Sequence, residues 1–278
     1  ASKYLQFANN NKLIMFPSNV NILMPNIELS TSSLDPDEVA NIDTISGERR
    51  IFIVGMPRSG STLLETVLSM NPAIKDLGES TSLSKAISYF QQQLSNAEPK
   101  TLYELYSTME PIDSSQYKYS TDKQLYNFVH TRFILSHLPA AMIIHCRRNP
   151  MDNILSMYRS NLMAGNNYTA SLEDAARVLI AQEQVMEFHK KRCPNSIFTF
   201  DYDQFVNATE VSLRKLLRWL DLEFDYNYLH PEKSTRCVNT ASVMQARRSI
   251  SNASVGGWEK YYDLLKPALK IFQDSGIE

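Results

Sequence analysis

The most constraining feature of the sequence is a loop with two glycines that joins an apolar segment to a segment with helical spacing. Ile51–Val54 is a short apolar and mainly β-branched run, which predicts a strand buried on both faces. The loop Gly55–Thr62 follows, and residues 61–70 have the spacing of a helix that ends at Asn71-Pro72. Strand, loop and helix in this order are typical of a phosphate-binding loop, where backbone N–H groups and a helix N-terminus face an anion.

Predicted strands and helices alternate along the rest of the chain. Further strands are expected at Ile74–Leu77, Ala141–Cys146 and Ser196–Tyr202. Helices are expected at residues 82–94, 101–109, 124–137, 151–162, 172–192 and 208–220, with short ones starting near Trp258 and Lys266. This alternation predicts a mainly parallel sheet. The fold class is therefore α/β, a three-layer P-loop-type fold in which helices flank a central sheet.

The first 48 residues do not share this alternation. They contain clusters of Asn, Ser and Pro with little periodicity. We interpret residues 1–48 as an N-terminal extension or linker, with at most one short helix at Pro36–Ile42. Residues 49–278 are expected to form one domain, and the sequence contains no internal repeat.

Composition and charge exclude several classes of protein. Lys and Arg number 28 and Asp and Glu number 30, giving a net charge of -2, so general binding to nucleic acid or anionic membrane is not indicated. No apolar run reaches the roughly 18 residues of a membrane-spanning helix, and the first residues do not resemble a signal peptide. The three cysteines and five histidines lack disulfide or metal-ligand spacing. We therefore expect a cytoplasmic protein without a metal site.

The glycine loop differs from that of nucleotide triphosphatases. The spacing from Gly55 to Gly60 equals that of a Walker A motif, but Ser61 stands where those enzymes need Lys. Arg58 is the cation that this loop offers instead. An ordinary strand-to-helix turn is the alternative interpretation. We favour phosphate binding because the strand, the helix, the Arg and the Ser61-Thr62 pair occur together.

A second motif follows the Ala141–Cys146 strand. That strand leads into Arg147-Arg148, whereas a kinase or triphosphatase needs an acidic residue there to hold Mg²⁺. Ser156 comes eight residues after Arg148, on a helix opened by Asn149-Pro150, and Arg with a hydroxyl suits a dianionic phosphate. From the residues alone, solvated surface arginines and a mid-helix Ser are an equally good interpretation.

Both motifs resemble those of the sulfotransferase family that uses 3′-phosphoadenosine 5′-phosphosulfate (PAPS). The string GMPRSGSTLLE is similar to the 5′-phosphosulfate loop of tyrosylprotein sulfotransferases and of bacterial sulfotransferases joined to tetratricopeptide repeats. The second motif resembles the family's 3′-phosphate-binding motif. The resemblance covers most of the chain after residue 50. It implies that PAPS is bound by Arg58, Ser59, Gly60, Ser61, Thr62, Arg148 and Ser156.

The resemblance also implies a general base. Glu79 follows Gly78 just after the Ile74–Leu77 strand, where tyrosylprotein sulfotransferases carry a Gly-Glu whose carboxylate is the proposed base. Without the resemblance, a turn or a helix cap would be the better interpretation of Glu79. No histidine stands at a place that suggests a catalytic role.

Lys123 is the second catalytic candidate. We expect Thr121 or Asp122 to cap the helix at residues 124–137. A cation at a helix start opposes the helix dipole, so Lys123 is expected to have an anionic partner. Bacterial relatives have a similar Asp-Lys string, and their Lys points at the sulfate and its leaving phosphate. The resemblance therefore implies that Lys123 and Arg58 stabilise charge during transfer.

Two C-terminal residues complete the implied cofactor site. Tyr202 follows the third strong strand, where the family often has a Tyr near the adenine, although a core tyrosine is an equal alternative. Arg247 lies in a segment that resembles the C-terminal cofactor loop of the bacterial members. Trp258 would begin the final helix, and core packing explains it equally well.

The resemblance implies an enzyme that moves a sulfuryl group from PAPS to an acceptor hydroxyl by in-line displacement, without a metal, leaving the product 3′-phosphoadenosine 5′-phosphate (PAP). The acceptor stays open among a protein tyrosine, a sugar, a lipid and a small alcohol, and an upstream tetratricopeptide region is possible. The alternatives are a P-loop nucleotide or small-molecule kinase and a non-catalytic phosphonucleotide-binding protein.

Overall fold

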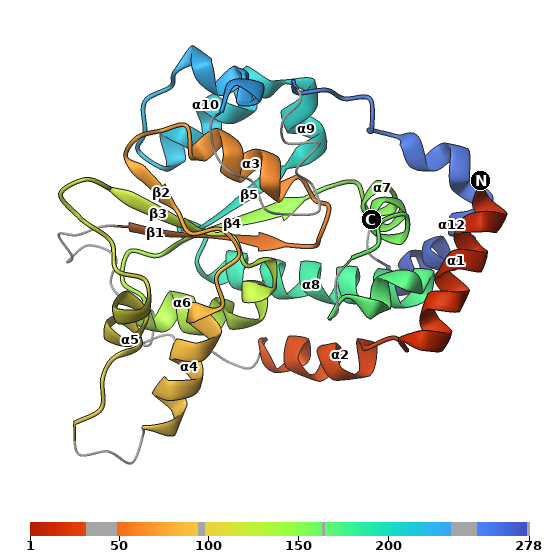
Figure 1. The fold of residues 1–278 in the computed structure, drawn as a ribbon, viewed down its shortest axis with the longest axis horizontal. Helices are drawn as coiled ribbons and strands as arrows, with labels where there is room; N and C mark the ends of the chain where they lie inside the picture. The colour runs from red at the N-terminus through yellow and green to blue at the C-terminus, as the bar shows by residue number, and fades with distance from the viewer. Residues whose placement is uncertain (32–48, 94–97, 163–164, 235–248, 277–278) are drawn as a thin grey trace.

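A computed structural model describes residues 1–31, 49–93, 98–162, 165–234 and 249–276 of the chain. Its centre is a parallel five-stranded sheet in the order β2-β3-β1-β4-β5 (Figure 1). The strands are β1 (Arg49–Gly55), β2 (Ile74–Asp76), β3 (Tyr119–Asp122), β4 (Met142–Arg147) and β5 (Ile197–Asp201). The predicted α/β class with a parallel sheet is confirmed.

Helices cover both faces of the sheet and complete the three layers (Figure 1). One face is covered by α3 (Ser61–Leu68), α9 (Tyr202–Asn207) and α10 (Thr209–Trp219). The helices on the other side are α4 (Ser82–Gln92), α5 (Leu102–Met109), α6 (Thr131–His137), α8 (Leu172–Arg192) and α12 (Tyr262–Ser275). The helix α7 (Pro150–Tyr158) follows β4 at the carboxyl edge of the sheet.

The central strand β1 shows why a continuous apolar run was a reliable signal. Ile51 and Ile53 belong to the apolar cluster shared with α3 and α10. Phe52 and Val54 belong to the cluster on the opposite face, shared with α8. Because side chains alternate between the two faces of a strand, a strand covered on both sides favours apolar residues at successive positions.

The strand β3 was not predicted. We expected Thr121 and Asp122 to open a helix, but all four residues of Tyr119–Asp122 are buried in a strand between β1 and β2. Because these residues carry hydroxyl and carboxyl groups, the sequence does not show the apolar pattern expected of a strand that is covered on both sides. The expected helix at 124–137 consists of a 3₁₀ helix, η3 (Leu125–His130), followed by α6.

The first 31 residues form two helices that we did not predict, α1 (Ser2–Met15) and α2 (Val20–Leu29). Asn9, in the Asn-rich stretch that obscured the helical period, is buried and its Nδ2 donates to the carbonyl of Tyr158 at 2.9 Å. Ile27 of α2 packs in the main apolar cluster. The expected helix at Pro36–Ile42 lies outside the described residues. Among the described helices, none combines the length and the apolar character needed to cross a membrane.

Candidate active site

The predicted site residues follow neighbouring strands at one edge of the sheet. In a parallel sheet the carboxyl ends of all strands lie at the same edge, where ligands bind in open α/β folds. The loop after β1 holds Arg58, the turn after β2 holds Glu79, and Lys123 is the first residue after β3. Arg148 comes directly after β4. Topology therefore gathers residues that are far apart in the sequence.

The loop after β1 has a backbone that requires its glycines. Gly60 has φ 93°, and a Cβ at this position would collide with Cδ2 of Tyr202, the first residue of α9. Arg58 also has a positive φ of 70°, which is uncommon outside glycine. Ser61 and Thr62 open α3, and the Oγ of Ser59 is fully buried with no hydrogen-bond partner in the part of the chain that the structure describes. The loop therefore has left-handed backbone conformations at Arg58 and Gly60, and a buried hydroxyl next to a helix N-terminus.

The helix α7 is tied to this loop. Arg58 Nε donates to Ser156 Oγ at 3.1 Å, and Asn153 Nδ2 donates to the carbonyl of Pro57 at 2.7 Å. Asn149 caps α7 by accepting the N–H groups of Met151 and Asp152. Burial lowers the pKa of Arg58, with a smaller effect of Arg148, but a guanidinium remains charged at neutral pH.

Arg148 lies between Tyr202, the loop and the C-terminal segment. Its guanidinium carbon is 4.8 Å from the centre of the Tyr202 ring. One terminal nitrogen donates to the carbonyl of Arg58 at 3.3 Å and the other to that of Ser254 at 3.0 Å. Its Nε is buried without a partner among the described residues. We call Arg58, Arg148, Ser156 and Tyr202 the guanidinium cluster.

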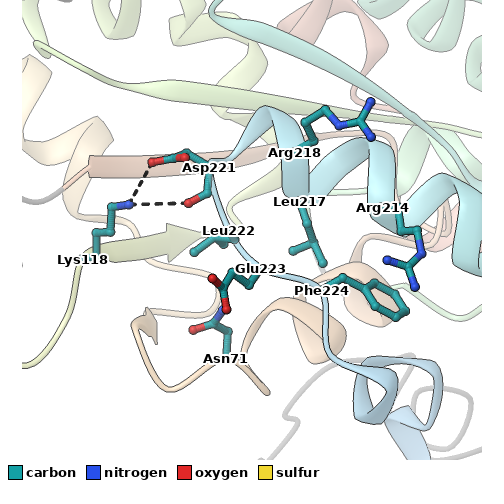
Figure 2. A pocket seen from close by; sticks show the side chains of 9 residues that line it. All are labelled: Asn71, Lys118, Arg214, Leu217, Arg218, Asp221, Leu222, Glu223 and Phe224. Atoms are coloured by element: carbon teal, nitrogen blue, oxygen red, sulfur yellow. Dashed lines mark hydrogen bonds and ion pairs between the residues drawn. The ribbon is translucent and has the colours of Figure 1, made fainter.

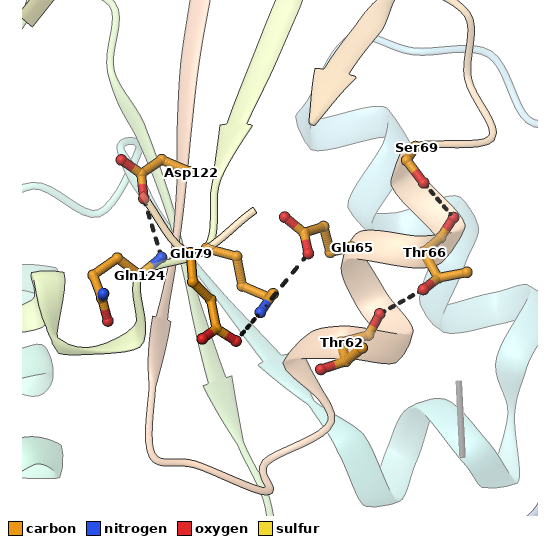
Figure 3. Close-up of polar contacts among 8 residues, drawn as sticks. Thr62, Glu65, Thr66, Ser69, Glu79, Asp122 and Gln124 are labelled. Carbon is orange, nitrogen blue, oxygen red and sulfur yellow. Dashed lines mark hydrogen bonds and ion pairs between the residues drawn. The ribbon is translucent and has the colours of Figure 1, made fainter. Parts of the chain in front are cut away.

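A second cluster surrounds Lys123. The ammonium nitrogen lies 2.6 Å from Oε1 of Glu79 and 3.9 Å from Oε2 of Glu65 on α3. Lys123 and Glu65 are 1% and 0% exposed, whereas Glu79 is 49% exposed. Figure 3 shows the side chains of Glu65 and Glu79 directed to the same space from opposite sides. We call Glu65, Glu79 and Lys123 the carboxylate–lysine cluster.

The cluster confirms the anionic partner expected for Lys123, but for a different reason. Lys123 directly follows a strand instead of opening a helix, and its backbone N–H donates to the carbonyl of Gly78 at 2.8 Å. This backbone bond places Glu79 beside Lys123. Glu65 was missed, and its only signal was an acidic residue within the apolar run of the first predicted helix.

Asp122 fixes the backbone next to Lys123. Tyr106 Oη donates to its Oδ2 at 2.7 Å, and the N–H of Gln124 and Nδ2 of Asn127 donate to its Oδ1 at 3.0 and 3.3 Å (Figure 3 draws Asp122 with Gln124). Burial nevertheless raises the pKa of Asp122 to about 6. The three donors hold the turn that leads from β3 into η3.

His145 and His130 are poor candidates for the base. Burial lowers the pKa of His145 to about 3, and its Nε2 lies 2.7 Å from Nε2 of Gln182 on α8. Burial also lowers the pKa of His130, whose Nε2 lies 3.2 Å from Ser84 Oγ. Glu79 is the half-exposed carboxylate at the carboxyl edge, so it remains the better candidate for proton transfer.

The structure brings most predicted site residues into these two clusters. Trp258 is partly buried against the main apolar cluster, and its backbone N–H donates to Asp152 Oδ1 at 2.9 Å. Asp152 also accepts the N–H of Gly256 at 2.7 Å, so the segment after Ser254 is held on α7. The predicted cofactor residue Arg247 lies outside the described residues.

An open hollow of about 740 Å³ lies elsewhere, near the ends of α3 and α10 (Figure 2). Lys118, which precedes β3, bonds Asp221 there at 3.1 Å. Because Lys118 comes before β3 and Lys123 comes after it, the hollow lies at the amino edge of the sheet. Its lining contains neither of the two clusters: Asn71, Lys118, Arg214, Leu217, Arg218, Asp221, Leu222, Glu223 and Phe224.

The sheet order and the loop after β1 define an α/β protein of the P-loop type. A model of the sulfotransferase family matches residues 50–106 and 91–226. This chain therefore belongs to the sulfotransferase family.

Two curated proteins are similar in sequence. An uncharacterized protein of Aquifex aeolicus (strain VF5) is 29% identical over 247 residues, which cover 82% of this chain and 32% of that protein. Protein-tyrosine sulfotransferase 1 of Danio rerio is 24% identical over 215 residues, covering 72% of this chain and 60% of that protein. The chain thus spans about a third and three fifths of these relatives.

Three solved structures share the fold. The sulfotransferase domain of the Synechococcus PCC 7002 olefin synthase has a TM-score of 0.58 at 17% identity, covering 86% of this chain and 98% of that one. The sulfotransferase domain from the curacin biosynthetic pathway has a TM-score of 0.56 at 17% identity, with 84% and 99% covered. Mouse sulfotransferase SULT7A1 complexed with PAP has a TM-score of 0.51 at 15% identity, with 88% and 90% covered.

Proposed function

We propose that this protein is a PAPS-dependent sulfotransferase that transfers a sulfuryl group to an acceptor hydroxyl. The observation that carries the proposal is the carboxylate–lysine cluster beside the phosphate-type loop. Glu79 and Lys123 form a 2.6 Å ion pair at the carboxyl edge of the sheet. One member can accept a proton and the other can stabilise a leaving anion.

The guanidinium cluster fits an anionic nucleotide. The buried Oγ of Ser59 and Nε of Arg148 are donors without partners among the described residues, which a bound phosphate oxygen would satisfy. Arg58 and Ser156, in contact through Nε and Oγ, offer a second cation and a hydroxyl. Tyr202 adds an aromatic face on which Arg148 already stacks.

The residues divide the transfer among them. When bound, PAPS supplies a sulfuryl group attached to a phosphate leaving group. Glu79 takes the proton as the acceptor O–H bond breaks and the oxygen forms its bond to sulfur. Lys123, Arg58 and the loop N–H groups stabilise the electron pair left on the phosphate oxygen as its bond to sulfur breaks. These cations provide the positive charge that a metal provides in other phosphoryl-type transfers.

The acceptor is proposed only as a hydroxyl compound. The named relative is a protein-tyrosine sulfotransferase, which makes a protein tyrosine one of the acceptors to test. A sugar, a lipid and a small alcohol are the others. A screen with ³⁵S-labelled PAPS and one compound of each class identifies the acceptor by transfer of the label.

Ligand-dependent unfolding tests the cofactor without an acceptor. PAP at about 100 times its Kd should stabilise the native state by about 2.7 kcal/mol, because it binds only the folded protein. ATP with Mg²⁺ should raise the melting temperature much less, because Ser61 stands where a triphosphatase has its Lys. Equal shifts for the two ligands, or no shift with PAP, would contradict the proposal.

A further inference from the structure

Glu65 is the member of the carboxylate–lysine cluster that the proposed mechanism does not use. It lies on α3, the helix that starts at the phosphate-type loop, and it is fully buried. Its Oε2 is 3.9 Å from Nζ of Lys123, on the side of the ammonium away from the half-exposed Glu79. A buried carboxylate beside a buried lysine compensates a charge that burial alone would penalise.

We infer that Glu65 is a positioning residue of the proposed reaction, the permanent counter-ion that holds the Lys123 ammonium in place while Glu79 takes up the acceptor's proton. The inference rests on the proposed function. Proton uptake neutralises Glu79 and weakens its 2.6 Å ion pair with Lys123 at the moment when the leaving phosphate needs a cation. Glu65 still holds the ammonium at that moment, so the ammonium can turn from Glu79 toward the phosphate.

The surroundings support a pairing between these two groups. The thiol of Cys146 on β4 is buried, and burial raises its pKa. Lys123 and Glu65 both act on that thiol with smaller and opposite effects, so both charges lie close to the same atom. The ion pair therefore lies between α3, β3 and β4, where water does not screen it.

Thermal unfolding tests the pairing. Lys123→Met removes the ammonium from a fully buried carboxylate and should lower the melting temperature by roughly 10 °C. Adding Glu65→Gln removes the carboxylate charge from which the ammonium was taken, and should recover more than half of that loss. The matched control is Glu183→Gln, which changes a partly buried glutamate that is paired with Arg147 at 2.8 Å. The control should recover nothing. Absence of recovery with Glu65→Gln overturns the inference.

Calorimetry with PAP tests the positioning role without an acceptor. The four proteins are wild type, Glu65→Gln, Glu79→Gln and the double variant. Either carboxylate alone still holds the ammonium in place, so each single variant should bind PAP nearly as well as wild type. The double variant should bind at least about tenfold more weakly than the product of the single effects predicts. In a Lys123→Met background the two substitutions should no longer interact.

The outcomes separate this inference from the proposed function. Multiplicative effects on PAP binding, or coupling that persists without Lys123, overturn the positioning role although PAP binding stands. If wild type does not bind PAP, the proposed function fails and the inference fails with it. Thermal recovery in that case would show an ion pair that serves only stability.

Discussion

The two clusters at the carboxyl edge of the sheet differ in the groups that contact their cations. In the guanidinium cluster, carbonyl groups and the ring of Tyr202 hold Arg148, which positions a cation without neutralising it. In the carboxylate–lysine cluster, Lys123 lies between two carboxylates. A site that binds an anion needs cations and hydrogen-bond donors, whereas a site that also moves a proton needs an acid and a base in contact. We therefore call the guanidinium cluster and its loop the binding side of the proposed site, and the carboxylate–lysine cluster the transfer side.

The largest expected effect tests the transfer side. Glu79→Gln keeps the shape of the side chain and removes proton acceptance, so turnover should fall by about 10²- to 10⁴-fold. PAP affinity should stay near that of wild type, because Glu65 still accompanies Lys123. Labelled sulfuryl transfer and PAP calorimetry measure the two quantities. Normal turnover of this variant would remove Glu79 as the base, and loss of PAP binding would move it to the cofactor site.

A glycine substitution in the loop after β1 should destabilise the binding side. Gly60→Ala places a Cβ against the Tyr202 ring at φ 93°, so we expect a loss of roughly 2–4 kcal/mol in unfolding free energy from backbone strain and overpacking. Gly165→Ala is the matched control, since Gly165 has the same φ and an added Cβ there would meet no atom of the described residues within 4 Å. Chemical denaturation measures both. Equal losses would mean that the ring contact is unimportant.

The pH dependence of stability sharpens the comparison, because the buried Asp122 directly precedes Lys123 of the carboxylate–lysine cluster. The pKa of Asp122 is raised to about 6 in the folded protein, and an unfolded Asp has a value near 3.9. The folded state therefore binds the proton of Asp122 more tightly than the unfolded state does. The resulting contribution to the free energy of unfolding is complete below about pH 4. It is lost as pH rises to about 6, by roughly 3 kcal/mol. In Asp122→Asn this fall should be absent, and denaturation at each pH compares the two proteins.

The smallest effects distinguish the phosphates on the binding side. Arg148→Ala and Ser156→Ala each remove a donor, and each should weaken PAP binding by roughly 1.5–3 kcal/mol. Adenosine 5′-phosphosulfate lacks the 3′-phosphate, so its binding should change little. Calorimetry with the two ligands gives the answer. Equal losses for both would indicate that these residues support the loop through Arg58 instead of binding the 3′-phosphate.

The two clusters also differ in how well the sequence predicted them. The loop after β1 and the Arg148–Ser156 spacing follow strands with continuous apolar runs, so strand, turn and helix were each visible locally. On the transfer side, β2 has three residues and β3 has four, and the residues of β3 are mostly polar. Glu79 and Lys123 were predicted through family resemblance, and the contact between them was not.

The helices of the first 31 residues illustrate the same limit. Their apolar periodicity was masked because the residue that anchors α1 is Asn9, which bonds to the carbonyl of Tyr158. A buried amide with a distant carbonyl partner looks like an ordinary surface residue in the sequence. Only the folded chain shows that it is paired.

By itself the sequence determined the α/β class, the central strand, the phosphate-type loop and the helix that follows it. Alternation, glycine and apolar runs act over a few neighbouring residues, so they are readable before folding. The tertiary structure decided that Tyr119–Asp122 is a strand and that Glu65 meets Lys123. A buried charge is costly without an opposite charge beside it, and Glu65 and Lys123 are far apart in the sequence, so only the fold brings them together.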